Sequence, residues 1–259
     1  DRLLSRGLGD VYKRQTLQFS GARSLGSGEG HFSTRLKDAS LSDADAWVWL
    51  AYDQLHGSML SSLQLDGTVG VIFIESSWKA KRRPYHQQKL GVLLSNQRHF
   101  ALELQDSGVP VIYLSSTESY SAVLAAVCQD IGPVHCINAA ERELREEVAP
   151  LVDDGRLIVH EHPGWLTPRS WFVSSVGEEP PFRMDAFYRK VRQETGWMMD
   201  GGKPIGGKYS YDAENRFPWK GDPPAPEPPT YQIDDIDREV EAMVRTHYGH
   251  HPGDVDLST

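Results

Sequence analysis

Residues 69–75 read VGVIFIE, a nearly continuous apolar run that ends in a carboxylate. Similar runs are AWVWLA at 46–51, VPVIYL at 109–114 and PVHCIN at 133–138, and a weaker fifth run is RLIVHEH at 156–162. Strands of a parallel sheet are covered on both faces, so they are apolar throughout rather than alternating. The five runs therefore predict five strands of a parallel sheet.

The segments between these runs show helical periodicity. Apolar residues recur on one face around 85–107, from 120 to 131, and again from 140 to 151. Alternation of strands and helices is typical of a doubly wound α/β fold with right-handed crossovers. We expect residues 45–180 to form one such domain, built on a mainly parallel, five-stranded, Rossmann-like sheet.

The chain on either side of this domain differs in composition. The first fifteen residues, DRLLSRGLGDVYKRQ, resemble translated sequencing-adapter read-through, and we interpret residues 1–15 as an artefact. Residues 16–44 are rich in Gly and Ser and sparsely apolar, which predicts disorder. After the domain we expect a helix with a Gly-Gly-Lys loop at 181–217 and a proline-rich linker at 218–231. Residues 232–259 contain one more helical stripe, and we expect them to begin a further domain.

Composition excludes several classes of protein. The net charge of −9 leaves no whole-chain basic field of the kind that grips nucleic-acid phosphates. No apolar run approaches the roughly 20 residues of a membrane span, and no signal-peptide pattern is present. Cys128 and Cys136 are too few for a disulfide framework or a four-thiolate cluster, and both are interpreted as core residues. We therefore expect a cytoplasmic protein with no membrane partner.

The sequence contains no recognisable catalytic or metal-binding motif. No G-x-G-x-x-G follows the first predicted strand, and no G-x-S-x-G is present. His160 and His162 could face one side of a strand, but a third ligand at sensible spacing is missing, so no metal site is predicted. We expect no catalytic residues in this chain, and whether it is part of an enzyme stays open at this point.

Polar side chains stand where the first three predicted strands end and where the helix after the second strand begins. Open α/β sheets bind ligands at this edge, and a helix N-terminus adds free backbone N–H groups. Such side chains can hydrogen-bond a hydroxylated or heterocyclic ligand, although helix capping and turn formation are the alternative role for each. The candidate pocket residues are Asp53, Gln54, Glu75, Tyr85, His86 and Ser115.

The stretch from 187 to 216 is too unusual for a generic core or linker. A basic amphipathic helix is followed by two Gly-Gly-Lys triplets and a polar end. Glycines let the backbone approach a partner closely and lysines supply charge, whereas the alternative is a mobile linker. The residues singled out in this loop are Gly202, Lys203, Gly207, Lys208, Asp212, Asn215 and Arg216.

This stretch resembles the signature segment of the photolyase-related proteins, the iron–sulfur bacterial branch of the cryptochrome/photolyase family. Other resemblances are those of Asp53-Gln54-Leu55 to the family's G-D-Q-L, of Tyr85-His86-x-Gln88-Lys89 to its helix signature, and of Arg98-x-Phe100 to its M-R-x-F. The final His250-His251-Pro252-Gly253-Asp254 resembles the segment that leads into the family's helical flavin domain. Two positions depart from these motifs: Tyr52 stands where the family has glycine, and Gln97 where it has methionine. A tyrosine at that turn would narrow the pocket.

The resemblance implies an N-terminal antenna domain that holds a 6,7-dimethyl-8-ribityllumazine-type pigment and passes excitation energy to FAD. It implies that FAD, a 4Fe-4S cluster and the surface for damaged DNA belong to a C-terminal helical domain absent from this sequence, whose start would be 232–259. The parent would be a (6-4) photolyase, a lyase that repairs DNA, or a cryptochrome-like photoreceptor. The partners implied are that flavin domain and, through it, damaged DNA, and this chain alone is not expected to be catalytic.

Two other functions stay open from the residues alone. A free-standing nucleotide- or flavin-binding module of flavodoxin-like shape would bind a phosphate near 115–117. A small interaction domain without a ligand would have a poorly formed pocket at Asp53.

Overall fold

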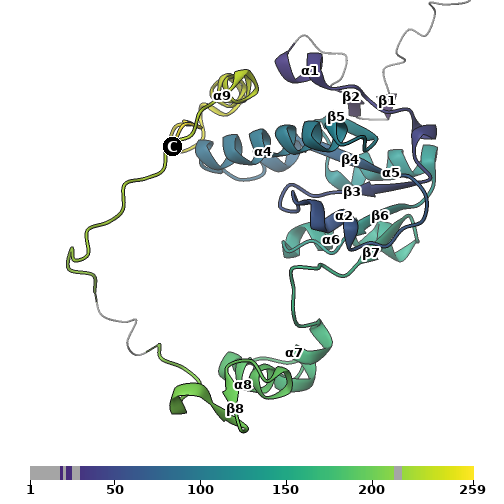
Figure 1. The fold of residues 1–259 in the computed structure, drawn as a ribbon. Coiled ribbons are helices and arrows are strands. Elements are labelled where there is room, and N and C mark those ends of the chain that lie inside the picture. The colour runs from purple at the N-terminus through teal and green to yellow at the C-terminus, as the bar shows by residue number, and fades with distance from the viewer. Residues whose placement is uncertain (1–17, 20–21, 25–29, 213–217) are drawn as a thin grey trace, which may run out of the picture. The chain divides into compact units, whose positions relative to one another are not determined.

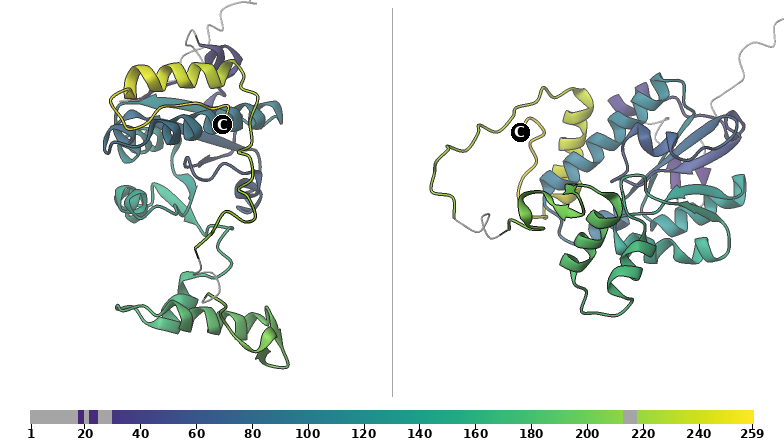
Figure 2. Two further views of the ribbon diagram at one scale, coloured as in Figure 1. Left: turned by 90° about the vertical axis from the view of Figure 1, so that its left-hand side faces the viewer. Right: turned by 60° about the horizontal axis from the view of Figure 1, so that its bottom comes forward.

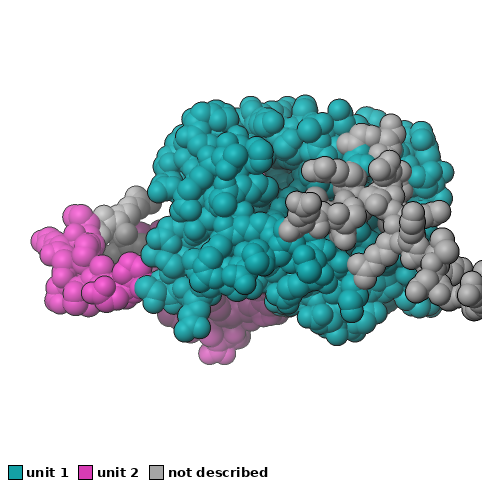
Figure 3. Space-filling view, turned by 90° about the horizontal axis from the view of Figure 1, so that it is seen from above, with its two compact units in different colours: residues 1–162, 229–259 teal, residues 163–228 magenta. Residues whose placement is uncertain are grey.

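The computed structural model describes residues 18–19, 22–24, 30–212 and 218–259. The chain forms two compact units, one comprising residues 1–162 with 229–259 and the other residues 163–228 (Figure 3). The first unit holds the sheet, and the second is built from helices and a short hairpin. The segment 1–15, interpreted as an artefact, lies outside the described residues.

The first unit is built on the predicted parallel sheet (Figure 1). Its parallel strands are β3 (Ala46–Trp49), β4 (Val69–Ser76), β5 (Val111–Ser116), β6 (Val134–Ile137) and β7 (Leu157–His160), and two short strands, β1 (Gln18–Phe19) and β2 (Ala22–Ser24), add antiparallel at the β5 edge. The parallel strands lie in the order β5-β4-β3-β6-β7, so the winding reverses between β3 and β6. Doubly wound sheets form a ligand crevice at this reversal, outside the carboxyl ends of their strands. The predicted fold class is confirmed.

Helices cover both faces of the sheet because successive side chains of a strand point to opposite faces. The helices of the first unit are α1 (His31–Arg35), α2 (Gly57–Ser61), α3 (Ser77–Lys81), α4 (Gln87–Asp106), α5 (Tyr120–Ile131), α6 (Arg142–Asp153) and α9 (Asp235–Tyr248), with a 3-10 turn η1 (Leu41–Asp43). Trp49 and Ile74 lie in the cluster that α5 and α6 cover, while Val48 and Phe73 lie in the cluster beneath α4. No helix in the described ranges is both long and apolar enough to cross a membrane.

Residues 30–44 pack against the sheet, which differs from the disorder expected for 16–44. Phe32 of α1 and Leu36, the residue that follows α1, are fully buried, and the ring of Phe32 meets that of Tyr113 edge-on at 4.7 Å between centroids. The backbone N–H of Leu36 donates to the carbonyl of Phe32 at 2.9 Å, which places the two apolar residues one turn apart. Because the segment is sparsely apolar on average, its composition did not reveal these two buried apolar residues.

The helix α9 returns to the first unit and packs along α4 (Figures 1 and 2). Val240 and Val244 are fully buried in a cluster with Leu90 of α4. Gly91 lets the chain after α9 approach closely, because a Cβ atom there would lie 2.5 Å from Val255 Cγ2. The apolar stripe of α9 is therefore buried on α4, and residues 232–259 belong to the first unit. The expectation that they begin a further domain stays a prediction.

The second unit is smaller and contains the Gly-Gly-Lys loop. Its elements are α7 (Arg169–Val176), α8 (Met184–Thr195), the hairpin strands β8 (Met199–Asp200) and β9 (Lys203–Pro204), and a 3-10 turn η2 (Ile205–Gly207). The helices α7 and α8 pack together through Phe172 and Phe187, whose ring centroids are 5.3 Å apart. The sheet unit consequently ends at His162 rather than at 180. The described residues 218–230 contain neither helix nor strand, as expected for the proline-rich linker.

If α1 is part of the folded core, Phe32→Ala will lower the free energy of unfolding by about 3–5 kcal/mol, because a fully buried ring is replaced by a cavity. The neighbouring exposed residue gives the matched control, and His31→Ala should change stability by less than about 0.5 kcal/mol. Urea unfolding followed by circular dichroism measures both values. Equal and small effects of the two substitutions would show that α1 does not pack on the sheet.

Candidate functional site

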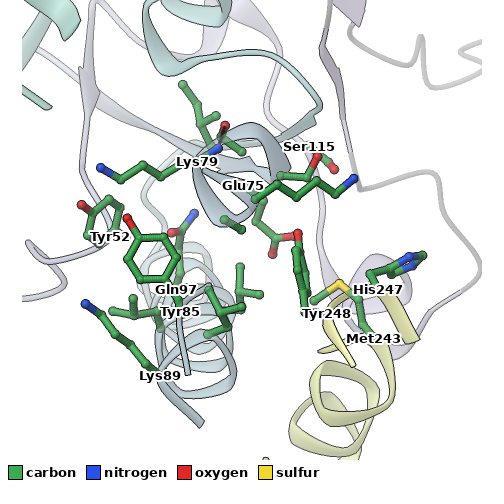
Figure 4. A pocket seen from close by; sticks show the side chains of 18 of the residues that line it. Tyr52, Glu75, Lys79, Tyr85, Lys89, Gln97, Ser115, Met243, His247 and Tyr248 are labelled. Atoms are coloured by element: carbon green, nitrogen blue, oxygen red, sulfur yellow. Dashed lines mark hydrogen bonds between the residues drawn. The ribbon is translucent and has the colours of Figure 1, made fainter. Parts of the chain in front are cut away.

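A cavity of about 430 Å³ opens at the carboxyl ends of β4 and β5, with walls from α3, α4 and α9 (Figure 4). Its apolar and aromatic lining includes Ile74, Leu90, Leu93, Leu94, Met243, Tyr85, Tyr120 and Tyr248. A predominantly apolar wall with a few polar groups is typical of small-molecule sites, and the volume lies in the range such sites occupy. Tyr52 and Glu141, which follow β3 and β6, also line the cavity, so its wall extends to the reversal point where a doubly wound sheet is expected to bind a ligand.

A buried ion-pair cluster, which we call the Arg98 cluster, fixes one side of the cavity. Arg98 of α4 donates to both carboxylate oxygens of Glu75 at 2.7 and 3.1 Å, and to Glu239 of α9 at 2.8 Å. The hydroxyl of Tyr113 donates to Glu75 Oε1 at 2.6 Å. Burial works against the charge of Arg98, but the adjacent Glu75 outweighs it, so the pKa of Arg98 is raised. The cluster joins β4, β5, α4 and α9 at one point.

A second cluster spans the reversal point of the sheet, where Tyr52 follows β3 and Glu141 follows β6. Glu141 accepts hydrogen bonds from the Tyr52 hydroxyl and from Lys79 Nζ, the latter at 2.6 Å. Burial alone would raise the pKa of Glu141, but these two donors outweigh it and the pKa lies below its usual value. Burial and the hydrogen bond to Glu141 raise the pKa of Tyr52. Tyr52 is therefore held in place as a neutral hydroxyl.

Three of the predicted pocket residues line the cavity together. Glu75 lies at the end of β4, Tyr85 just before α4, and Ser115 in β5. Both carboxylate oxygens of Glu75 are already bonded within the Arg98 cluster, so its role here is to hold the wall. Lys89 Nζ lies 5.2 Å from the ring centroid of Tyr85 and brings a cation to the same wall. A ligand-binding role for the three residues stays a prediction.

The other three predicted pocket residues do not line this cavity. Gln54 is buried and bonds the backbone, accepting from Ala51 N at 3.2 Å and donating to Ile137 O at 3.1 Å. It therefore ties the turn after β3 to the end of β6. Asp53 borders a separate hollow, and burial raises its pKa. Asp53 and Gln54 therefore do not line the cavity that Glu75 lines, and a ligand-binding role for these residues stays a prediction.

His86 is a capping residue that faces the C-terminal segment. Its Nδ1 accepts from Gln88 N at 3.2 Å at the start of α4, and the ring packs so closely on Gly253 that a Cβ atom there would clash with it. Gln87 and Gln88 donate to the carbonyls of Gly253 and Asp256, each at 2.6 Å. The helix motif at 85–89 thus binds the segment after α9.

The structure adds pocket residues that sequence reasoning missed. Lys79 and Glu141 lie in loops or short helices without a periodic signal, and Met243 and Tyr248 come from α9, more than a hundred residues away in sequence. The two departures from the family motifs, Tyr52 and Gln97, also line the cavity. For these two residues, the departure from the motif is the sequence feature from which a place in the cavity could have been predicted.

The Gly-Gly-Lys loop is anchored by a residue that sequence reasoning did not select. Arg192 of α8 is buried, donates to the carbonyls of Trp197, Met198 and Tyr209, and lies over the rings of Tyr188 and Tyr209. The predicted loop residues Gly202 and Gly207 have φ of +77°, a conformation that favours glycine. Lys203 belongs to β9, Lys208 lies 5.6 Å from the ring centroid of Tyr211, and Asp212 is exposed. Asn215 and Arg216 lie outside the described residues, and an interdomain role for the loop stays a prediction.

Histidines lie in two polar clusters outside the cavity. His135 and His160 of β6 and β7 are bonded through Nδ1 and Nε2 at 2.8 Å, and burial lowers the pKa of His135. His99 Nε2 lies 3.2 Å from Asp237 Oδ1. One nitrogen or carboxylate oxygen from each of His99, Asp234 and Asp237 lies within 4.8 Å of the others. Asp234 accepts the first backbone N–H groups of α9, so this cluster serves to cap and dock that helix.

The structure thus defines an α/β domain with a cavity at its carboxyl edge, and this domain is similar to known proteins. The sequence profile of the deoxyribodipyrimidine photo-lyase-related proteins matches residues 48–258. The chain is 27% identical over 184 residues to a (6-4) photolyase of Agrobacterium fabrum, covering 66% of this chain and 35% of that protein. It is 33% identical over 136 residues to an uncharacterized protein of Acanthamoeba polyphaga mimivirus, covering 49% of this chain and 69% of that protein.

The chain belongs to the deoxyribodipyrimidine photo-lyase-related proteins, as the match over most of its length shows. The resemblance drawn from the sequence motifs is confirmed. The matched region spans about a third of the length of the (6-4) photolyase.

The Arg98 cluster predicts a large effect on stability. Arg98→Met leaves Glu75 buried without its counter-ion, which should lower the free energy of unfolding by about 3–5 kcal/mol. Adding Glu75→Gln to this variant removes the unpaired charge and should recover part of the loss. Arg142→Met removes an exposed arginine from a surface pair and is the control in urea titrations. A loss no larger than that of the control would contradict the role of the cluster.

The lowered pKa of Glu141 predicts a pH-dependent effect of Tyr52→Phe. Removing the hydroxyl raises the pKa of Glu141, so the variant should be less stable than the wild type at neutral pH. Because the folded pKa is depressed, the difference is complete above about pH 5 and shrinks as pH falls through that pKa. Urea unfolding at several pH values measures it, with the exposed Tyr231→Phe as control. A difference that is independent of pH would rule out this coupling.

Proposed function

We propose that this chain binds a heterocyclic antenna pigment, a 6,7-dimethyl-8-ribityllumazine-type molecule, in the cavity at the carboxyl ends of β4 and β5. The observation that carries the proposal is this cavity of about 430 Å³ in a member of the photolyase-related family. An apolar slot with aromatic walls suits a planar ring system, and polar groups at its edge suit a polyhydroxylated side chain.

The residues that line the cavity can contact such a pigment in two ways. Leu93 and Leu94 on α4 and Met243 on α9 offer apolar contact to a ring. Ser115 and Lys89 offer hydrogen-bond partners to ribityl hydroxyls. Excitation transfer depends on the distance and orientation of the two chromophores, so a pigment must be held rigidly. The Arg98 cluster and the Tyr52–Glu141–Lys79 cluster supply rigid walls on both sides.

The function proposed for the whole protein follows from the family. We infer that the bound pigment passes excitation energy to FAD, which a C-terminal helical domain would hold together with a 4Fe-4S cluster. The parent is proposed to be a light-driven repair photolyase acting on damaged DNA, or a cryptochrome-like photoreceptor. The pigment would supply light absorption only, and this chain's residues would fix its position. The cytoplasmic location stays a prediction from the sequence.

Titration of the chain with 6,7-dimethyl-8-ribityllumazine tests the pocket. We expect uptake at micromolar concentration with a red-shifted absorption band. Leu93→Trp should fill the cavity and weaken binding at least about tenfold, a loss of about 1.4 kcal/mol. Val92→Trp adds the same side chain at an exposed neighbouring position and should bind as the wild type does.

Two results would contradict the proposed pigment site. One is the absence of uptake by the wild-type chain at micromolar concentration. The other is equal binding by Leu93→Trp and Val92→Trp, which would place the ligand elsewhere. Binding of flavin mononucleotide that depends on its phosphate, without binding of the lumazine, would support the flavodoxin-like alternative.

A further inference from the structure

One buried polar side chain of the cavity has an unused donor. Gln97 of α4 is only 2% exposed, and its Nε2 has no hydrogen-bond partner among the described residues. Figure 4 shows Gln97 among the side chains that enclose the cavity. A buried N–H group without a partner destabilises the folded protein, so such groups are rare in native structures.

Two charged side chains of the cavity wall, Arg98 and Lys79, are already bonded within the protein. Arg98 donates to Glu75 and Glu239, and Lys79 donates to Glu141. These charges are therefore paired before any ligand arrives. The Gln97 amide is neutral and its buried Nε2 donor has no partner among the described residues, so this group is able to contact a ligand directly.

We propose that Gln97 donates a hydrogen bond to an exocyclic carbonyl oxygen of a planar heterocyclic ligand, and that it thereby selects ligands that carry such an oxygen. This inference rests on the proposed pigment site and adds the residue that recognises the ring. The apolar neighbours Leu93 and Leu94 on the same helix favour a ring beside Gln97 rather than a hydroxylated chain. Sites that hydrogen-bond a ligand discriminate strongly against analogues without the matching group, because the buried donor is then left unpaired.

The position of Gln97 in the motif identifies a matched variant. The family motif that Arg98 and Phe100 resemble has methionine at this place, and methionine is close to glutamine in length but cannot donate. Gln97→Met therefore removes the donor while keeping the volume of the wall. A second variant, Gln97→Leu, tests the same loss with another apolar side chain. The exposed Gln129→Met on α5 is the control for the substitution itself.

The experiment measures affinity, absorption and thermal stability of the full chain with 6,7-dimethyl-8-ribityllumazine. Gln97→Met and Gln97→Leu should weaken binding about tenfold, while Gln129→Met should not. The bound absorption maximum should differ between the wild type and Gln97→Met, because the donor contacts the chromophore itself. Without ligand, the Tm of Gln97→Met should be unchanged or a few degrees higher, since an unpaired buried amide is removed.

Each other outcome overturns a distinct part of the account. Equal affinity of the wild type and Gln97→Met would overturn this inference and leave the pigment site intact. Weaker binding with an unchanged absorption maximum would assign Gln97 to the ribityl chain and overturn the carbonyl contact. A ligand-free Tm several degrees lower in both Gln97 variants would make the residue structural. Absence of binding by the wild-type chain would overturn the pigment site and this inference together.

Discussion

The buried ion pair between Arg98 and Glu75 is the interaction on which the architecture of the cavity depends. Glu75 ends β4 and Arg98 lies in the middle of α4, so the pair fixes the helix against the carboxyl edge of the sheet. Arg98 also reaches Glu239, whose other oxygen accepts from the backbone of Phe32 at 3.2 Å. A charge removed from water must be fully paired to be tolerated, and this requirement links α1, α4, α9 and the sheet at one place.

A second set of contacts brings two distant segments of the chain together beside this cluster. The helix motif at 85–89 and the segment after α9 bind each other through backbone carbonyls, and α9 supplies Met243 and Tyr248 to the cavity. The sheet alone would leave the apolar face of α4 and the cavity open to water. In this chain, the segment after the linker therefore completes the cavity that the sheet begins.

The sequence predicted the sheet because strands covered on both faces are apolar throughout, and it predicted α4, α5 and α6 because their stripes are long. It placed Glu75, Tyr85 and Ser115 at one edge through the rule for doubly wound sheets. Gln54 and His86 could not be assigned in this way, because a polar side chain at the end of a strand or helix serves a ligand or the backbone equally well. The contributions of Glu141 and α9 depend on contacts such as Arg98–Glu239, 141 residues apart, which no local pattern contains.

The most direct test of the central claim is an NMR titration of the chain labelled at its five methionine methyl groups with 6,7-dimethyl-8-ribityllumazine. Met243 lines the cavity, whereas Met184, Met198 and Met199 belong to the second unit. We predict that the Met243 signal shifts in a saturable manner while those three stay in place. An unchanged Met243 signal at saturation, or shifts confined to the second unit, would show that α9 does not form part of a ligand site.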